Sequence, residues 1–391
     1  MPDRMPGPSR RSRGARNPFV VVGNAIFTAT ILIAIVVGIT LMIGKQRFEA
    51  RGPLQEDKTV NIPKGYGPRD IAELLTREGV IEQPWVFIGG VIVRKAREEL
   101  RYGEYQFTKH ASISDVLDTI IEGRVVQHQF TVPEGLTSEQ IVQRLLENDI
   151  LTGSLREIPR EGSLLPESYR FTRGMPRDQV IQRMQQAQKR LLQEIWDRRM
   201  SDLPIKTPEQ LVTLASIVEK ETGKPEERTR VAAVFVNRLK QRIKLQSDPT
   251  IIYGLVGGKG TLGRPIQRNE ITQPTPYNTY VIEGLPPGPI ANPGRASLEA
   301  AANPARTKEL FFVADGTGGH AFAENLEQHN RNVARLRAIE RGDATPAAAA
   351  PAAPPAAAFA PVDTQPAGSA QTRGTTARRP GTTPAPAARA Q

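Results

Sequence analysis

The longest apolar stretch of the chain lies near its N-terminus. Residues 19–44 are uncharged and mostly aliphatic, and the run exceeds the roughly 20 residues that a membrane-spanning helix needs. Residues 1–17 are rich in arginine, so the positive-inside bias places them in the cytoplasm and places the chain after Lys45 outside it. The competing interpretation is a cleaved signal peptide, whose apolar region is usually about 7–15 residues long and precedes a small-residue cleavage site. We therefore expect a retained single-pass helix over residues 18–44, anchored in the cytoplasmic membrane.

Two stretches after a polar spacer share one pattern of apolar positions. Each begins with an aliphatic residue, a proline and a nearby glycine, and then places two aliphatic residues four positions apart. The first stretch spans residues 62–81, the second spans residues 132–151, and a looser copy begins at Gly103. The pattern predicts a strand, a turn, a short amphipathic helix and the start of a second strand at 79–81 and at 149–151. On periodicity alone, a repeated packing unit without a ligand is the favoured interpretation.

Helical and extended patterns alternate from about residue 155 to residue 340. Helical spacing of apolar residues predicts helices over 179–199, 208–222 and 228–240. Two short apolar segments, 310–314 and 321–322, flank a glycine-rich turn and predict a hairpin. Alanine, proline and threonine dominate residues 344–391, which predicts a disordered tail. The chain therefore has the pattern of an α+β protein.

The charge and composition of the chain exclude several classes of partner. The net charge is +11, but the terminal segments hold much of it and the aromatic fraction is only 5%, which argues against nucleic acid. The chain has no cysteine, so disulfides, thiolate metal sites and a cysteine nucleophile are excluded. The four histidines include no pair spaced to share one helix face, which argues against a built-in metal centre. We expect no cofactor.

The best candidate for chemistry is an apolar helical segment that ends in Glu219-Lys220-Glu221. At about 100° per residue, the two glutamates lie on opposite flanks of the apolar face. Partial burial would raise the pKa of a carboxyl group and keep it protonated near neutral pH, as a general acid requires. The competing interpretation is a solvated last turn with ordinary charges. Spacing does not choose between the two glutamates.

Other polar segments have structural interpretations that compete with chemical ones. Asp248 precedes Pro249, which is the pattern of a helix N-cap followed by proline, so capping is favoured over catalysis. The sequence around Lys259 superficially suggests a phosphate loop, but a glycine follows the lysine where serine or threonine is needed, and we reject it. The loops at 274–280 and 284–294 are rich in proline, tyrosine and asparagine, and either line a saccharide cleft or serve as turn scaffolding.

Taken together, several strings closely resemble the YceG-like family of membrane-bound endolytic murein transglycosylases. The matching strings are residues 214–222, 236–239, 245–253, 277–280, 284–290 and 312–320. The resemblance implies a LysM-like module of βααβ type at 58–130, associated with glycans that contain N-acetylglucosamine. It also implies a catalytic domain of mixed α+β fold at 131–340, on the extracytoplasmic side of the membrane.

The resemblance also implies roles for individual residues. It places the catalytic glutamate in Glu219-Lys220-Glu221, and we assign it to Glu221, with Glu219 as a neighbour that tunes or orients it. The expected supporting or substrate-binding residues are Glu219, Gln246, Asp248, Tyr277, Asn278 and Tyr280. Residues 161–169 also resemble a family motif, from which Ser163, Leu165 and Glu167 depart.

The implied reaction cleaves the bond between N-acetylmuramic acid and N-acetylglucosamine inside nascent strands without water. Glu221 would protonate the glycosidic oxygen and then take a proton from the muramyl 6-hydroxyl, leaving 1,6-anhydro ends and terminating strand elongation. Two alternatives stay open. One is a hydrolytic muramidase, which needs a second carboxylate such as Asp248 or Glu167. The other is a non-catalytic, glycan-binding division scaffold. The expected partners are glycan strands, the cytoplasmic membrane, and a peptidoglycan synthase or division proteins.

Overall fold

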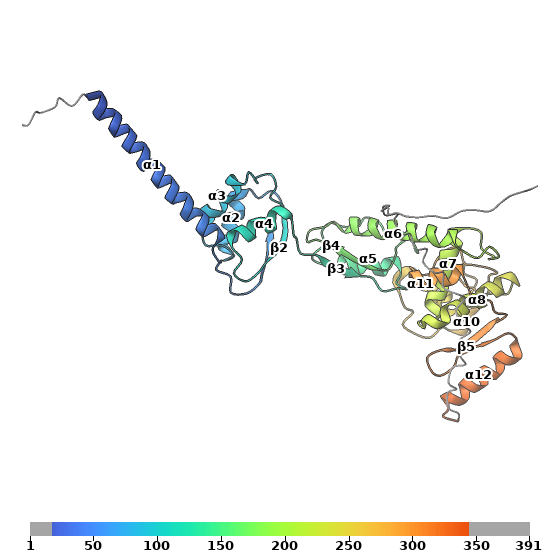
Figure 1. Cartoon of the computed structure of the whole chain (residues 1–391). Coiled ribbons are helices and arrows are strands. Elements are labelled where there is room, and N and C mark those ends of the chain that lie inside the picture. Colours follow the sequence, from blue (N-terminus) through green and yellow to red (C-terminus); the bar gives the residue numbers. More distant parts are fainter. Residues whose placement is uncertain (1–17, 344–391) are drawn as a thin grey trace, which may run out of the picture. The chain divides into compact units, whose positions relative to one another are not determined.

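The computed structural model describes residues 18–343 (Figure 1). The basic segment predicted at 1–17 and the tail predicted at 344–391 lie outside the described residues. The described part begins with α1 (Pro18–Glu49), whose segment Val22–Glu49 is long and apolar enough to cross a membrane. The large apolar side chains described in the apolar run of this helix, up to Ile43, are exposed, as expected of a surface that faces lipid rather than water.

A first mixed unit follows α1 and has its own apolar core. Its elements are β1 (Lys58–Ile62), α2 (Pro68–Arg77), α3 (Pro84–Val93), β2 (Gly103–Phe107) and α4 (Ile113–Glu122). The strands pair antiparallel with Val60 opposite Tyr105, and the amphipathic helices α2 and α4 bury aliphatic side chains in the core. Phe48 of α1 packs against the same core, which is why α1 continues beyond the predicted end at residue 44.

The strand predicted at 79–81 is wrong, because these residues form the turn that ends α2. Gly79 has a φ of +71°, and the N–H group of Val80 donates to the carbonyl of Leu75. Val80 and Ile81 are buried, so their side chains pack in the core although the residues do not belong to a sheet. The partner of β1 is instead β2, the segment at which the looser copy of the pattern begins.

The second copy of the pattern contributes β3 (His128–Thr131) and α5 (Ser138–Leu146). The partner of β3 is β4 (Ser168–Phe171), to which it pairs antiparallel. The strand predicted at 149–151 is also wrong. The side chain of Asn148 accepts the N–H groups of Ile150 and Leu151 and holds the segment in a turn. In both copies an aliphatic run that follows a helix is a buried turn.

The remaining elements build a mostly helical core. They are α6 (Arg177–Asp197), α7 (Pro208–Glu221), η1 (Pro225–Glu227), α8 (Arg228–Lys240), α9 (Asp248–Val256), η2 (Gly257–Lys259), α10 (Arg268–Ile271) and α11 (Arg295–Ala302). The three predicted helices are confirmed as α6, α7 and α8. Helix α7 is in contact with α6, α8, α9 and α11, and its residues 211–218 are all buried.

The predicted hairpin is confirmed as β5 (Phe311–Ala314) and β6 (His320–Ala323), which pair antiparallel and are followed by α12 (Leu326–Glu340). Phe312 meets Phe235 of α8 edge-on, with 5.8 Å between the ring centroids. The hairpin also carries His320, whose ring is hydrogen-bonded to Glu227 shortly after the end of α7. The described part of the chain is a mixed α+β structure, in which every sheet has two strands.

Glu104 of β2 connects the first unit to the strands that follow. Its buried carboxylate accepts a hydrogen bond from His128 of β3 and another from Arg173, with 2.8 Å between the Arg173 Nε and Glu104 Oε1 atoms. Burial raises the pKa of Glu104, but these two hydrogen bonds outweigh it, so the pKa lies below its ordinary value. A carboxyl group with a lowered folded-state pKa stabilises the fold above its unfolded-state pKa, and this stabilisation disappears as pH falls through the folded-state value.

We expect Glu104→Gln to lower the free energy of unfolding by roughly 1–3 kcal/mol at neutral pH, because two charge-assisted hydrogen bonds weaken. The difference from the natural chain should shrink in acid, where Glu104 itself becomes protonated. Thermal unfolding of the full chain in detergent at several pH values measures this. Glu122→Gln is the control, since Glu122 pairs with Arg124 at an exposed site and should change stability little. Equal effects of the two variants would contradict the expectation.

Candidate active site

The end of α7 positions the two candidate glutamates. The helix begins with Pro208 after Thr207, whose hydroxyl group accepts the N–H group of Gln210, and it ends at Glu221. Because the preceding eight residues are buried, the last turn emerges from a packed core and cannot rotate freely. Glu219 and Glu221 are two positions apart, so they leave opposite sides of this turn.

The Glu219 carboxylate is hydrogen-bonded to a backbone N–H group. Its Oε2 atom accepts the N–H group of Gly294 at 2.9 Å, and Gly294 is the N-cap of α11. Glu134 lies nearby, and its pKa is raised first by burial and then by the negative charge of Glu219. A Cβ atom at Gly135 would lie 3.4 Å from the Cγ atom of Glu219, so there is little free space around this side chain. These contacts give Glu219 a structural role in joining α7 to α11.

Glu221 has a different environment. Its Oε1 atom accepts a hydrogen bond from the Ser247 hydroxyl group at 2.5 Å. Burial raises the pKa of Glu221, and the negative charge of Asp248 adds to this, whereas the Ser247 hydrogen bond and the positive charges of His320 and Arg238 oppose it. The net shift is upward, so Glu221 holds its proton to a higher pH than an ordinary glutamate. A carboxyl group with these properties can act as a general acid.

The predicted N-cap role of Asp248 is wrong. The N-cap of α9 is Ser247, one residue earlier, and Asp248 is the first residue of the helix. The N–H group of Ser247 donates to the hydroxyl group of Thr279, which holds the residue in the extended conformation that precedes the helix. The exposed carboxylate of Asp248 accepts a hydrogen bond from the Tyr280 hydroxyl group at 2.7 Å. Asp248 is also close enough to Glu221 for its negative charge to raise the pKa of Glu221.

The loop at 277–280 contains residues of two kinds. Asn278 is buried, and its amide group donates to the carbonyls of Glu270, Ile271 and Gln273, so it holds the loop in shape. Tyr277 and Tyr280 are partly exposed. Tyr277 packs against Tyr253 of α9 with 4.9 Å between the ring centroids.

Gln246 is exposed and has a φ of +53°, and its side-chain oxygen accepts a hydrogen bond from Arg238 at 3.3 Å. The structure thus groups Asp248, Tyr280 and Gln246 around the Ser247–Glu221 pair. Tyr277 contacts α9 further along the helix, at Tyr253. Asn278 is buried and fixes the conformation of the loop.

Three residues at this site were not singled out by the sequence. Ser247 bonds to Glu221 directly, while Arg238 and His320 act on it through their charge. Arg238 is itself held by the carbonyls of Leu310 and Leu245, and His320 is held by Glu227, with 2.7 Å between the His320 Nδ1 and Glu227 Oε2 atoms. All three lie in strings that resemble the family, but nothing in their local pattern predicts that they meet at Glu221.

A second buried carboxyl group, Glu161, lies at the other end of α9. It accepts hydrogen bonds from the N–H group of Ser138 at 2.8 Å, from the amide group of Asn292 at 3.0 Å and from the Tyr253 hydroxyl group at 3.2 Å. Burial raises the pKa of Glu161, and these hydrogen bonds oppose the rise. Glu161 therefore ties α5, α9 and the loop at 284–294 together, which gives the motif at 161–169 a structural role.

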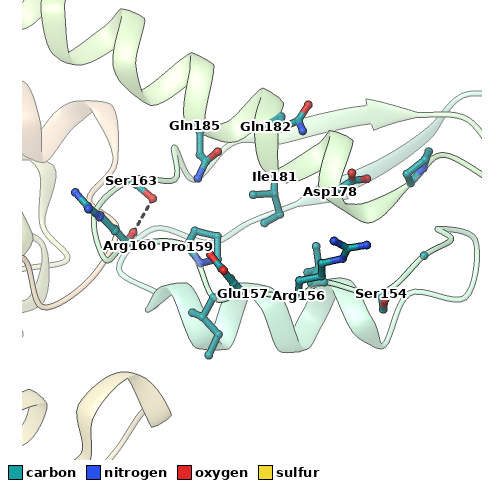
Figure 2. A pocket seen from close by; sticks show the side chains of 14 residues that line it. Ser154, Arg156, Glu157, Pro159, Arg160, Ser163, Asp178, Ile181, Gln182 and Gln185 are labelled. Atoms are coloured by element: carbon teal, nitrogen blue, oxygen red, sulfur yellow. Dashed lines mark hydrogen bonds between the residues drawn. The ribbon is translucent and has the colours of Figure 1, made fainter.

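One open cleft is separate from this site. It has a volume of about 840 Å³, and it is lined by residues 153–160, Ser163 and the start of α6, where Arg156, Asp178 and Gln182 face it (Figure 2). No residue of α7 or α9 contributes to its lining in the part of the chain that the structure describes. Among residues 18–343, no three His, Cys, Asp or Glu side chains are grouped so that they could hold a metal ion. The carboxyl cluster at Glu221 is therefore the candidate active site.

The comparisons with known proteins identify the family of the chain. The sequence model of the YceG-like family matches residues 60–335, and the chain belongs to that family. It is 27% identical to the endolytic murein transglycosylase of Bacillus subtilis over 333 residues, which cover 76% of this chain and 90% of the relative. It is 29% identical to the endolytic murein transglycosylase of Streptococcus pneumoniae over 324 residues, which cover 71% of this chain and 58% of the relative.

A solved structure of a YceG-like protein from Listeria monocytogenes is also similar. It is 28% identical in sequence, and the match covers 71% of this chain and 98% of that one with a TM-score of 0.44.

We expect Ser247→Ala to raise the pKa of Glu221 further, because the hydroxyl group stabilises the charged carboxylate and its loss leaves burial unopposed at this atom. Titration of the side-chain carboxyl signals by NMR measures the shift, with Glu221→Gln identifying the signal. Ser163→Ala is the matched control, since the Ser163 hydroxyl group donates to the carbonyl of Arg160 at the separate cleft. A Glu221 pKa that is unchanged or lower in Ser247→Ala would contradict the expectation.

Proposed function

We propose that the chain is a membrane-anchored lytic transglycosylase that cuts peptidoglycan glycan strands internally. The observation that carries the proposal is Glu221, a carboxyl group at the end of a buried helix whose pKa is raised by burial and which accepts a hydrogen bond from Ser247. The reaction class is supported by the relatives from Bacillus subtilis and Streptococcus pneumoniae, which are endolytic murein transglycosylases.

In the proposed reaction, Glu221 works first as an acid and then as a base. Its proton passes to the oxygen of the bond between N-acetylmuramic acid and N-acetylglucosamine as that bond breaks at C1 of the muramyl sugar. The resulting carboxylate takes the proton of the muramyl 6-hydroxyl group, and the freed oxygen pair closes on C1 to give a 1,6-anhydro end. No water is consumed, and one carboxyl group serves both steps.

The surroundings of Glu221 suit both forms of the carboxyl group. Burial and the charge of Asp248 favour the protonated form, which the first step needs. The Ser247 hydroxyl group and the charges of Arg238 and His320 favour the carboxylate, which the second step needs. Because these influences oppose one another, neither form is trapped. The arrangement fits a group that changes its protonation state twice in each cycle.

Substrate contacts are proposed for exposed and partly exposed residues beside Glu221 and on the loop at 277–280. Tyr277 and Tyr280 offer flat faces to sugar rings, and Gln246 and Asp248 offer hydrogen-bonding groups. Asn278 is proposed to support them from inside the loop. Glu219 is proposed to orient the end of α7 through Gly294. These roles assign a task to every residue predicted from the sequence.

The first mixed unit is proposed to be the LysM-like module. Its β1, α2, α3 and β2 elements follow one another in βααβ order, with the two strands paired antiparallel, which supports the proposal. With α1 spanning the cytoplasmic membrane, we propose that the module and the catalytic part lie on its extracytoplasmic side, where nascent strands are made. A peptidoglycan synthase or division proteins are the proposed partners there.

A hydrolytic muramidase is the second candidate, and one observation favours it. Asp248 proves to be an exposed carboxylate beside Glu221 rather than a helix cap. An inverting or retaining hydrolase uses such a second carboxylate to activate water or to attack the sugar. Asp248 is therefore a carboxylate of the kind that hydrolysis needs beside Glu221, and the two reactions must be separated by their products.

We expect Glu221→Gln to lower the rate of strand cleavage by about 10²–10⁴-fold, because a positioned general acid contributes about that much. Its thermal stability at neutral pH should not fall. A buried carboxyl group with a raised pKa destabilises the fold once it is charged, and glutamine removes that cost. Chromatography of digested glycan strands measures the rate. Glu219→Gln is the matched control and should keep activity within a few-fold, since its amide oxygen can still accept the Gly294 N–H group. Full complementation of a deletion strain by both variants would favour the non-catalytic scaffold.

The products of the natural chain and of Asp248→Asn distinguish the two reactions. Lytic cleavage predicts anhydro ends from both proteins, with activity of the variant declining at a lower pH because loss of the Asp248 charge lowers the pKa of Glu221. Hydrolysis predicts reducing ends that are heavier by one water, and near-complete loss of activity in Asp248→Asn. Mass spectrometry of the released fragments decides, and reducing ends without anhydro sugars would overturn the proposed reaction.

A further inference from the structure

Helix α3 differs in composition from its neighbours. All ten of its residues, Pro84-Trp85-Val86-Phe87-Ile88-Gly89-Gly90-Val91-Ile92-Val93, are apolar, yet the exposed fractions of Trp85, Ile92 and Val93 are 58%, 70% and 78%. The adjacent helix α2 is amphipathic and presents Arg69 and Glu73 to solvent. A helix that is apolar on all sides is normally surrounded by protein or by lipid. The exposed side of α3 therefore lacks the solvent-facing polar residues that α2 has.

The two sides of α3 have different surroundings. Val86, Phe87 and Val91 are buried in the core of the first mixed unit. At about 100° per residue, Trp85 and Ile92 share the opposite side of the helix, and Val93 extends it at the C-terminal end. We call Trp85, Ile92 and Val93 the outer side of α3. Ordinary core packing explains the inner side and leaves the outer side unexplained.

The C-terminal end of α3 lies against the membrane-spanning candidate α1. A Cβ atom at Gly90 would lie only 2.4 Å from the Phe48 ring, so α3 approaches α1 closely at this glycine. The Arg94 guanidinium carbon lies 5.1 Å from the centroid of the same ring. Phe48 is less than one helical turn beyond Lys45, the first charged residue after the apolar run. The outer side of α3 is thus close to the level at which α1 would leave the membrane.

We propose that the outer side of α3 contacts the lipid surface of the membrane that α1 crosses. This inference rests on the proposal that α1 spans a membrane. Continuity with α1 supports lipid as the occupant, since the same stretch of α1 that contacts α3 ends the apolar run. Tryptophan is favoured at the boundary between acyl chains and head groups, and Ile92 and Val93 would enter the apolar layer.

The charged residues beside this surface are compatible with lipid head groups. Exposed cationic residues flank it on α1 and after α3: Lys45, Arg47, Arg51, Lys95 and Arg97. Exposed acidic residues lie on the same stretches: Glu49, Glu98 and Glu99. Because these five cationic and three acidic residues leave a net charge of only +2, electrostatic attraction to anionic lipid is modest, and burial of the apolar outer side supplies most of the proposed contact.

The test uses the fluorescence of Trp85 in the full chain reconstituted into phosphatidylcholine vesicles. The chain has two tryptophans, so Trp196→Phe leaves Trp85 as the only one, and Trp85→Phe leaves Trp196 in α6 as the matched control. Vesicles made with lipid brominated near the head group quench a tryptophan that touches the acyl layer. We expect a large loss of Trp85 emission and little loss of Trp196 emission. The pair Ile92→Ser and Val93→Ser, added to Trp196→Phe, should reduce the quenching of Trp85, whereas Leu326→Ser, at an exposed position on α12, should not.

Extraction of the same vesicles with alkaline carbonate separates the two proposals. A chain that stays with the vesicles while its Trp85 emission is unquenched would overturn the lipid contact and leave the α1 anchor standing. The outer side of α3 would then be assigned to a protein partner. Equal quenching of Trp85 and Trp196 would overturn the contact as well, because it would be non-specific. Release of the chain by carbonate would overturn the α1 anchor and with it the inference.

Discussion

The burial of α7 is the constraint on which the candidate site depends. Residues 211–218 are enclosed by α6, α8, α9 and α11, so the last turn of the helix has one position and one rotation. Its two glutamates then meet the N-terminal caps of two different helices. Glu219 accepts the backbone of Gly294 at α11, and Glu221 accepts the hydroxyl group of Ser247 at α9. The same packing that fixes these partners leaves Glu221 only partly exposed, and burial raises its pKa.

The local pattern of apolar residues was sufficient to predict the elements whose buried side follows a regular spacing. Helices α7 and α8 and the β5–β6 hairpin follow the spacing of their apolar residues. Spacing could not choose between Glu219 and Glu221, because both flank the apolar face of α7. The difference between them arises from residues distant in sequence, Gly294 and Ser247, which only the tertiary structure brings to the helix end. The same reason kept Arg238 and His320 out of the predicted site.

The two wrong strand predictions share a physical cause, and the wrong cap has another. At 79–81 and 149–151 the aliphatic residues follow a helix and form turns that pack against a core. Their apolar side chains therefore resemble those of a buried strand in the sequence. Aspartate before proline is a common capping pattern, but the hydrogen bond between Ser247 and Thr279 moves the cap one residue earlier. That shift of one residue changes the environment of the Asp248 carboxylate. It frees the Asp248 carboxylate for Tyr280 and leaves it beside Glu221.

The use of Glu221 as both acid and base has a consequence for turnover. In the proposed reaction the proton that Glu221 gives to the departing sugar is replaced by the proton that it takes from the muramyl 6-hydroxyl group. The enzyme ends each cycle in the state in which it began, without exchanging a proton with bulk solvent. A partly buried carboxyl group that accepts a hydrogen bond from one serine is sufficient for such a closed cycle, and no relay of waters has to recharge it.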